Sequence, residues 1–213
     1  QYDVAMALVR SWLCEQATAQ GACGQCASCH AIDVHAHADL CVLMPETVMM
    51  AMGWPLSEKA QDDIDSKKRK ASKEIRVEAM REAVEFSQRT SARGRGKAVL
   101  VFPAERMNVY TANALLKTLE EPPGDVKFAL ATDAAHQLLP TIRSRCLAHA
   151  MVWPDDAAAM KWLQGQGITQ NKARVMLRAA GGRPPDALQY SVLCEVWPRL
   201  PRAVVEGNVS LFK

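Results

Sequence analysis

Four cysteines near the start of the chain have the spacing of a metal site. Cys14 is followed by eight residues and then by the run Cys23-x2-Cys26-x2-Cys29. Thiolates are preferred ligands of Zn²⁺, and x2 spacings let two ligands of one turn reach the same tetrahedral ion. The loop between them is rich in small residues and has two glycines, which suit such tight turns. We therefore expect these four cysteines to hold one structural zinc ion.

An iron–sulfur cluster is the main alternative, because C-x2-C-x2-C also opens ferredoxin-type motifs. Those motifs continue with x3-C-P, whereas here no C-P follows and the fourth cysteine lies upstream. Thiols without a metal are a further alternative. His30 and His37 could replace one cysteine, but four cysteines already close a structural site, so surface positions are expected for both. A closed site leaves no open position for catalysis.

Composition limits the other functions that the chain could have. It has 213 residues, of which 49% are hydrophobic and 23% are charged, enough for one sizeable core and a smaller second unit. The net charge of +3 does not by itself indicate nucleic acid or a membrane. No apolar run approaches the roughly 18 residues of a membrane span, and no signal peptide opens the chain. We therefore expect a cytoplasmic protein with reduced cysteines.

The elements that must position these residues alternate between strands and helices. Apolar runs predict strands at 40–44, 97–102, 127–132 and 147–152, and periodic segments predict helices at 4–13, 108–120 and 140–145. The segment 75–86 fits a short strand or turn followed by a helix. Strands that are apolar throughout and alternate with helices indicate a parallel sheet with both faces covered. The fold class expected for residues 1–153 is therefore α/β.

Two segments depart from this alternation. Residues 46–72 carry an acidic run, then a basic run over 67–70, and few large apolar residues, which predicts a mobile surface insertion. The basic run could also be a phosphate-binding patch. From 154 to 191 only helices are predicted, with acids opening the first, Thr169 capping the second and prolines opening the third. This indicates a small three-helix bundle, followed at 192–213 by the stub of a further domain.

Together these residues resemble the bacterial DNA polymerase III clamp loader subunits of the AAA+ class. The resemblance extends from about Asp3 to Tyr190 and rests on the cysteine module at 14–29, NALLKTLEEPP from Asn113, and LPTIRSRC ending at Cys146. It implies an AAA+ type parallel sheet with helices on both faces, a zinc-binding loop and a helical lid bundle. It also implies a chain that lacks its first few dozen residues and a C-terminal collar domain.

This chain differs from the ATP-hydrolysing subunits of the family at positions that hydrolysis requires. The motor subunits, gamma and tau, hydrolyse ATP and are similar to this chain except that they carry an Asp-Glu pair where it has Phe102 and Pro103. Without those acids, Mg²⁺ and the attacking water cannot be positioned. Glu105 lies two residues too late and is expected to be a solvent-facing turn residue. The chain thus resembles the delta-prime branch, which does not hydrolyse ATP.

Nucleotide binding by this chain is not expected either. In the helical unit, the motor subunits have a sequence similar to G-x-x-R-D-A-L. Here Pro185 stands at the position of that arginine, and Arg183 lies two residues earlier. No G-x-x-x-x-G-K-[ST] phosphate loop is present, and the run GRGK at 94–97 precedes a strand, not a helix. Structural zinc is the one cofactor that the sequence predicts.

Arg145 is the residue to which the resemblance gives a role in catalysis. It lies in the run Ser144-Arg145-Cys146, and in clamp loaders an arginine of this motif reaches the nucleotide of the neighbouring subunit as an arginine finger. The structural alternative is that Arg145 caps the short helix before it and pairs with a surface acid. Arg143 is the nearest competitor for the role.

The resemblance implies the following function. The chain would be a non-hydrolysing subunit of the DNA polymerase III holoenzyme, a DNA-directed DNA polymerase. It would work with the gamma or tau and delta subunits to load the sliding clamp onto primed DNA, without a membrane. An ATP-hydrolysing gamma- or tau-like subunit is the alternative. A zinc-binding nucleic-acid protein of another class is disfavoured by the α/β pattern and the modest charge.

Overall fold

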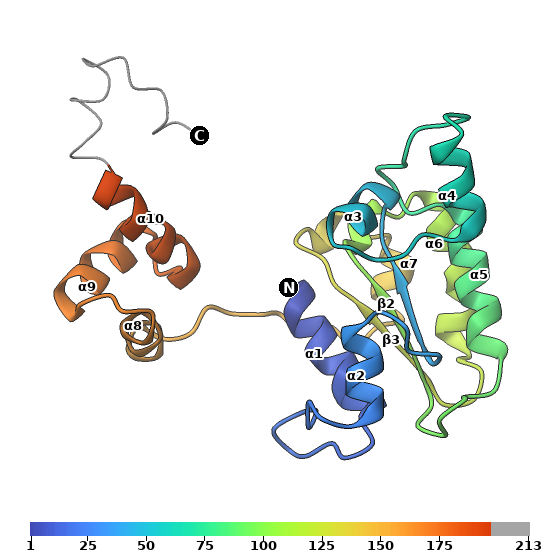
Figure 1. The fold of residues 1–213 in the computed structure, drawn as a ribbon, viewed down its shortest axis with the longest axis horizontal. Coiled ribbons are helices and arrows are strands. Elements are labelled where there is room, and N and C mark those ends of the chain that lie inside the picture. The colour runs from blue at the N-terminus through green and yellow to red at the C-terminus, as the bar shows by residue number, and fades with distance from the viewer. Residues whose placement is uncertain (197–213) are drawn as a thin grey trace. The chain divides into compact units, whose positions relative to one another are not determined.

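The computed structural model describes residues 1–196 and divides into two compact units (Figure 1). The first unit is an α/β unit that spans Gln1–Ala148, and the second, helical unit begins at His149. The sequence predicted a boundary between residues 153 and 154, which is five residues later. Each unit has a hydrophobic core of its own.

The α/β unit is built on a three-stranded parallel sheet with the order β1-β2-β3 in the described residues. Its strands are β1 Leu40–Leu43, β2 Lys97–Val101 and β3 Val126–Leu130. Every residue of the central strand β2 is buried, as expected of a parallel strand covered on both faces. The predicted α/β class with a parallel sheet is confirmed.

Helices cover both faces of this sheet (Figure 1). Side chains of β2 alternate between the cores on the two faces. Val99 and Val101 pack in the core beneath α5 and α6, whereas Ala98 and Leu100 pack in the core beneath α1 and α2. This alternation follows from the period of two along a strand. The four covering helices are α1 Tyr2–Leu13, α2 Ala27–Asp33, α5 Val77–Gln88 and α6 Val109–Glu120.

Local sequence signals explain where α6 begins and ends. The side chain of Asn108 accepts a hydrogen bond from the backbone N–H of Thr111, which caps the first turn. Leu115 is fully buried against the sheet. Pro122 and Pro123 follow Glu121, and a proline pushes the residue before it out of the helical region. α6 therefore ends at Glu120, beside the segment that carries Arg145.

The segment 46–72 contains more structure than the sequence predicted. It forms α3 Glu46–Ala51 and α4 Glu58–Asp65. The carboxylate of Glu46 is buried and forms an ion pair with Arg69 at 2.6 Å, so one basic residue of the run 67–70 is held by the protein itself. Arg69 is therefore not available for the phosphate-binding patch that was the alternative for this run. Mobility of the remaining segment stays a prediction.

Three short elements complete the α/β unit. The helix predicted at 140–145 is present and is four residues long. Two single turns of 3-10 helix flank the strands β2 and β3 on their carboxyl sides. These elements are η1 Ala104–Arg106, η2 Ala135–Gln137 and α7 Pro140–Arg143.

The helical unit is the predicted three-helix bundle, with α8 Asp156–Gly165, α9 Gln170–Ala179 and α10 Pro184–Val196. Small and aliphatic side chains form its core. Asp155 caps α8 through its side chain, whereas Thr169 occupies the cap position of α9 without a side-chain hydrogen bond. α10 runs five residues beyond the expected end at 191, and the rest of the predicted stub, 197–213, lies outside the described residues.

The strand predicted at 147–152 does not form. These residues have no regular secondary structure, and Leu147 and Val152 are 101% and 86% exposed. A strand exists only when a neighbour satisfies its backbone groups. Within residues 1–196 the edge strand β3 pairs with β2 alone, so apolar composition was not sufficient. None of the described helices is long and apolar enough to cross a membrane.

Candidate functional site

The four predicted cysteines lie together at one end of the α/β unit. Cys14 ends α1, Cys26 caps α2, Cys29 lies in its first turn and Cys23 lies in the loop between them. All four sulfur atoms lie within 4.8 Å of one another. The Cys14 sulfur lies 3.5 Å from that of Cys23 and 3.8 Å from that of Cys26. Tetrahedral zinc with bonds of about 2.3 Å needs sulfurs about 3.8 Å apart, so the cluster fits.

Backbone N–H groups point at two of these sulfurs. The N–H groups of Gln16 and Cys23 donate to the sulfur of Cys14 at 3.4 and 3.3 Å, and the N–H of Cys29 donates to that of Cys26 at 3.5 Å. The Cys29 N–H lowers the pKa of Cys26 to about 6, whereas burial raises the pKa of Cys29 to about 12. The site thus favours the thiolate at Cys26, and a bound cation would favour the thiolate at Cys29.

Neither nearby histidine belongs to the cysteine cluster. His30 is exposed, as predicted, but His37 is buried, so its predicted surface position was wrong. Its Nδ1 accepts a hydrogen bond from the backbone N–H of Asp39 at 3.1 Å. Burial lowers the pKa of His37, and Arg93 lowers it further. His37 is therefore a neutral part of the packed structure.

A loop from residue 89 to residue 96, before β2, connects the cysteine module to the sheet. Arg95 donates to the carbonyl oxygen of Cys14 at 2.8 Å, and Arg93 donates to Glu15 at 3.0 Å. Glu15 also accepts from the N–H and hydroxyl of Ser28 at 3.2 and 3.0 Å. Two arginines thus hold the chain at Cys14 and Glu15, where α1 leads into the cysteine loop. The sequence predicted only a loop at 94–97 and gave no local signal for these contacts.

The same loop is anchored by a buried carboxylate, Asp39, at the start of β1. Asp39 accepts from the N–H groups of Ala92 and Arg93 at 2.7 and 2.9 Å and from the hydroxyl of Ser91 at 3.0 Å. The ammonium of Lys97 lies 3.7 Å away, and both side chains are at least 95% buried. Burial raises the pKa of Asp39, but the hydrogen bonds outweigh it and the pKa lies below its usual range.

Arg145 lies at the surface, at the end of α7. Its side chain is 30% exposed, and it lines a shallow hollow of about 460 Å³ with Leu119, Glu120 and Ser144. The guanidinium forms an ion pair with Glu120, and its Nη1 donates to the carbonyl oxygen of Thr141 at 2.8 Å. These are the contacts that the structural alternative predicted, a surface acid and the cap of the preceding helix. A role toward a second subunit stays a prediction.

The other residues of this motif differ in their surroundings. Ser144 donates to the carbonyl oxygen of Thr141 at 3.1 Å and accepts from Arg145 at 3.3 Å. Cys146 is half-buried, and burial raises its pKa. Arg143 is exposed on α7. The motif therefore holds one arginine in a defined geometry, Arg145, and presents a second beside it.

The carboxyl end of β2 carries Phe102 and Pro103, joined by a cis peptide bond. The Phe102 ring packs 5.4 Å from that of Tyr2. Glu105 follows in η1 and is half-buried, with one carboxylate oxygen that has no hydrogen-bond partner in the described residues. Its predicted solvent-facing position was therefore wrong. The carboxyl end of the central strand is apolar at the two positions where the motor subunits were expected to carry acids.

The arginine of the helical unit that the sequence analysis singled out is held within its own unit. Arg183 donates to the carbonyl oxygen of Ala180 at 3.1 Å and forms an ion pair with Asp186 at 3.0 Å. Pro185 lies between them in the first turn of α10. These contacts link the end of α9 to the first turn of α10, which gives Arg183 a structural role.

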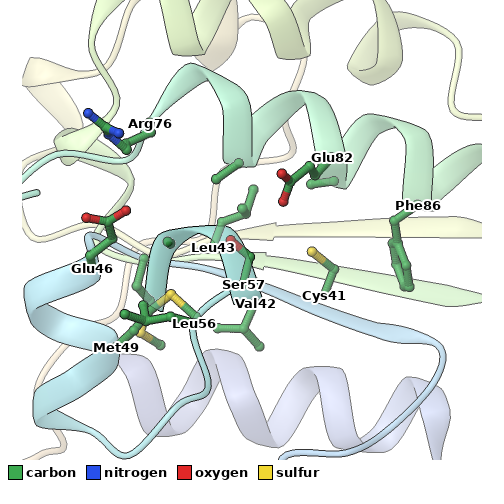
Figure 2. Close-up of a pocket in the computed structure, with 14 residues that line it drawn as sticks. Cys41, Val42, Leu43, Glu46, Met49, Leu56, Ser57, Arg76, Glu82 and Phe86 are labelled. Carbon is green, nitrogen blue, oxygen red and sulfur yellow. The ribbon is translucent and has the colours of Figure 1, made fainter. Parts of the chain in front are cut away.

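A second hollow, of about 290 Å³, lies beside β1 and is largely apolar (Figure 2). Figure 2 shows Glu46 and Arg76 on one side of it and Cys41 and Phe86 on the other. Burial, together with the charge of Glu82, raises the pKa of Cys41 to about 12. A thiol with a raised pKa is a poor nucleophile, so Cys41 is not expected to react in this hollow.

Comparisons with known proteins agree on one family. A family model described as DNA polymerase III, delta subunit, matches residues 1–152. DNA polymerase III subunit delta' of Pseudomonas aeruginosa is 37% identical, over 97% of this chain and 57% of the relative. Subunit delta' of Escherichia coli is 33% identical, over 85% and 48%. DNA polymerase III subunit tau of Salmonella typhimurium is 33% identical, over 68% and 18%. The chain thus spans about half the length of these delta' relatives.

Proposed function

Since the chain belongs to the DNA polymerase III delta subunit family, we propose that it is a non-hydrolysing subunit of the clamp loader. In that role it helps to load the sliding clamp onto primed DNA and supplies Arg145 to a neighbouring ATPase subunit. Its partners are the gamma or tau and delta subunits. The resemblance to delta' subunits that the sequence analysis stated is confirmed by the relatives.

The observation that carries the non-hydrolysing role is the end of β2. Hydrolysis of a nucleoside triphosphate requires carboxylates that hold Mg²⁺ and orient water. Phe102 and Pro103 follow the last residue of this strand, and the Phe102 ring packs against Tyr2. Glu105 is further along, in η1, with one oxygen buried. The chain has no acid at the position where the metal would need one.

The observation that supports a role in trans is the surface position of Arg145. An arginine that serves another subunit must lie at the surface, keep its charge and be held so that its donors are ordered before the partner arrives. Arg145 lines an open hollow and is held from two sides. An active gamma- or tau-like subunit is the second candidate, because a tau subunit is also a relative, but Phe102 and Pro103 speak against it.

The experiment is steady-state ATP hydrolysis by the full-length protein, alone and in the reconstituted complex. Alone, the protein is expected to match a control without enzyme. In the complex, Arg145→Ala is expected to lower DNA-stimulated hydrolysis, because an arginine finger can contribute about a thousandfold at the site that it faces. The loss should be partial, since this arginine serves one site of several.

Arg143→Ala is the matched control, because it removes an exposed arginine two residues before Arg145, at the end of α7. It should leave hydrolysis and folding unchanged. Hydrolysis by the protein alone that disappears in Glu105→Gln would contradict the non-hydrolysing role. A complex with Arg145→Ala that assembles and keeps full activity would contradict the finger.

A further inference from the structure

The ion pair between Glu120 and Arg145 connects the end of α6 to the end of α7. We propose that Glu120 is a positioning residue: it holds the Arg145 guanidinium at the edge of the surface hollow, ready for the phosphates of a nucleotide on the neighbouring subunit. This inference rests on the proposed function, because it requires that Arg145 acts in trans. It assigns a second residue to that action.

The contacts define the orientation of the whole guanidinium group. One carboxylate oxygen of Glu120 accepts from Nε of Arg145 at 2.6 Å and also from Nη2. On the other side, Nη1 donates to the carbonyl oxygen of Thr141 at 2.8 Å and lies 3.3 Å from the hydroxyl of Ser144. All three guanidinium nitrogens are therefore contacted, and the planar group cannot rotate freely.

These contacts leave a donor for a ligand. A guanidinium has five N–H groups, and the contacts above use those of Nε and Nη1 and one on Nη2. The second hydrogen of Nη2 remains available at the hollow that Glu120 and Arg145 line. A phosphate oxygen can accept a hydrogen bond from it there, while Glu120 keeps its hydrogen bonds to Nε and Nη2.

The two partners are held in place by the core. Glu120 is the last residue of α6, the helix that packs against the sheet through Leu115. Arg145 follows α7, which is anchored by the buried Ile142. The core therefore holds the backbone at both ends of the pair, and the ion pair has to order only the two side chains.

The ion pair between Glu120 and Arg145 is weak, which suits a residue that orders a side chain. The side chains of Arg145 and Glu120 are 30% and 47% exposed, and exposed ion pairs favour one geometry by only about two- to fivefold. Such a pair can order one side chain. Because one N–H of Nη2 is not used by these contacts, the pair orders the guanidinium without occupying the donor that a phosphate oxygen would accept from.

The test uses the full-length protein assembled with its ATPase subunits. Glu120→Ala is expected to lower kcat for DNA-stimulated ATP hydrolysis about two- to fivefold at the site that Arg145 faces, with little change in KM. Glu120→Gln keeps an oxygen that accepts hydrogen bonds and should retain more activity than Glu120→Ala. Glu121→Ala is the matched control, since it removes an exposed carboxylate one residue further on, and it should behave like the parent.

A double substitution separates this inference from the proposed function. In a complex that already carries Arg145→Ala, Glu120→Ala should cause no further loss, because Glu120 acts through Arg145. A further loss there, or a higher kcat with Glu120→Ala alone, would overturn the positioning role. If Arg145→Ala lowers kcat and Glu120→Ala does not, this inference alone is wrong. If Arg145→Ala has no effect, the proposed function is wrong and the inference with it.

Discussion

At the scale of single residues, the proposed roles of this chain rest on two features, the four clustered cysteines and Arg145. The four cysteine sulfurs converge within 4.8 Å, and Arg145 presents a permanently charged group at the surface. Both features suit a subunit that contributes structure and one contact to a neighbour. The cysteine cluster allows a direct chemical measurement.

Purified full-length protein is expected to contain about one zinc ion per chain, because four cysteine sulfurs lie within 4.8 Å of one another and a structural zinc ion takes four such ligands. Cys26→Ser should remove most of the zinc. Cys41→Ser is the matched control, since Cys41 is a free thiol beside β1, outside the cluster. The measurement is elemental analysis of protein prepared without added metal. Iron with visible absorption, or a metal content that Cys26→Ser leaves unchanged, would contradict a zinc site.

At the scale of elements, the loop before β2 joins the cysteine module to the sheet. Its arginines bind the backbone at Cys14 and the side chain of Glu15, and its backbone binds Asp39. Gly96 ends the loop at φ 77, and a Cβ there would lie 2.4 Å from the carbonyl oxygen of Asp125. The loop can therefore take this path only with glycine at that position, which brings Lys97 beside Asp39.

Asp39→Asn is expected to destabilise the α/β unit by about 3 kcal/mol, because it leaves the buried ammonium of Lys97 without its charged partner. Asp125→Asn is the matched control. It removes a carboxylate from an exposed pair with Lys127, and such pairs contribute about 0–1 kcal/mol. Chemical denaturation measures both. Equal losses in the free energy of unfolding for the two variants would contradict a larger contribution from the buried pair of Asp39 and Lys97.

The pH dependence of stability follows from the same carboxylate. The pKa of Asp39 is lowered in the folded state, so its contribution is present above the unfolded pKa of about 4 and is lost as pH falls through the lower folded value. The parent should therefore lose more stability on acidification than Asp39→Asn, which has no proton to take up at that position.

At the scale of the whole molecule, the chain is made of two units with separate cores. The cysteine cluster, the loop that holds it and the pair of Glu120 and Arg145 all belong to the first unit. The second unit contains α8, α9 and α10. Effects of the metal should therefore be confined to one part of the chain.

Removal of metal with a chelator should weaken the first unit and leave the second nearly unchanged. Structural zinc contributes about 10 kcal/mol to the folding of small zinc domains, and here the cysteines bind to the loop that also contacts β1. Amide hydrogen exchange is the measurement: protection should fall in α1, α2 and the start of β2, and should persist in α8 and α9. An equal loss of protection in both units would contradict separate cores.

The sequence alone was sufficient for most elements and for the cysteine cluster. Continuous apolar runs predicted β1, β2 and β3, the periodicity of α6 and its proline stop predicted that helix, and the cysteine spacing predicted the convergence of four sulfurs. These features succeed because periodicity and close spacing are local: the residues that reveal them are neighbours along the chain.

Tertiary structure alone decided which distant side chains meet. Asp39 and Lys97 pair because β1 and β2 lie side by side in one register, and Glu120 and Arg145 pair because α6 and α7 end at the same place. The apolar run 147–152 failed as a strand for the same reason, since no edge in the described residues pairs with it. Composition reports a preference for burial, whereas a hydrogen bond or an ion pair also requires a partner that only the packed chain brings within reach.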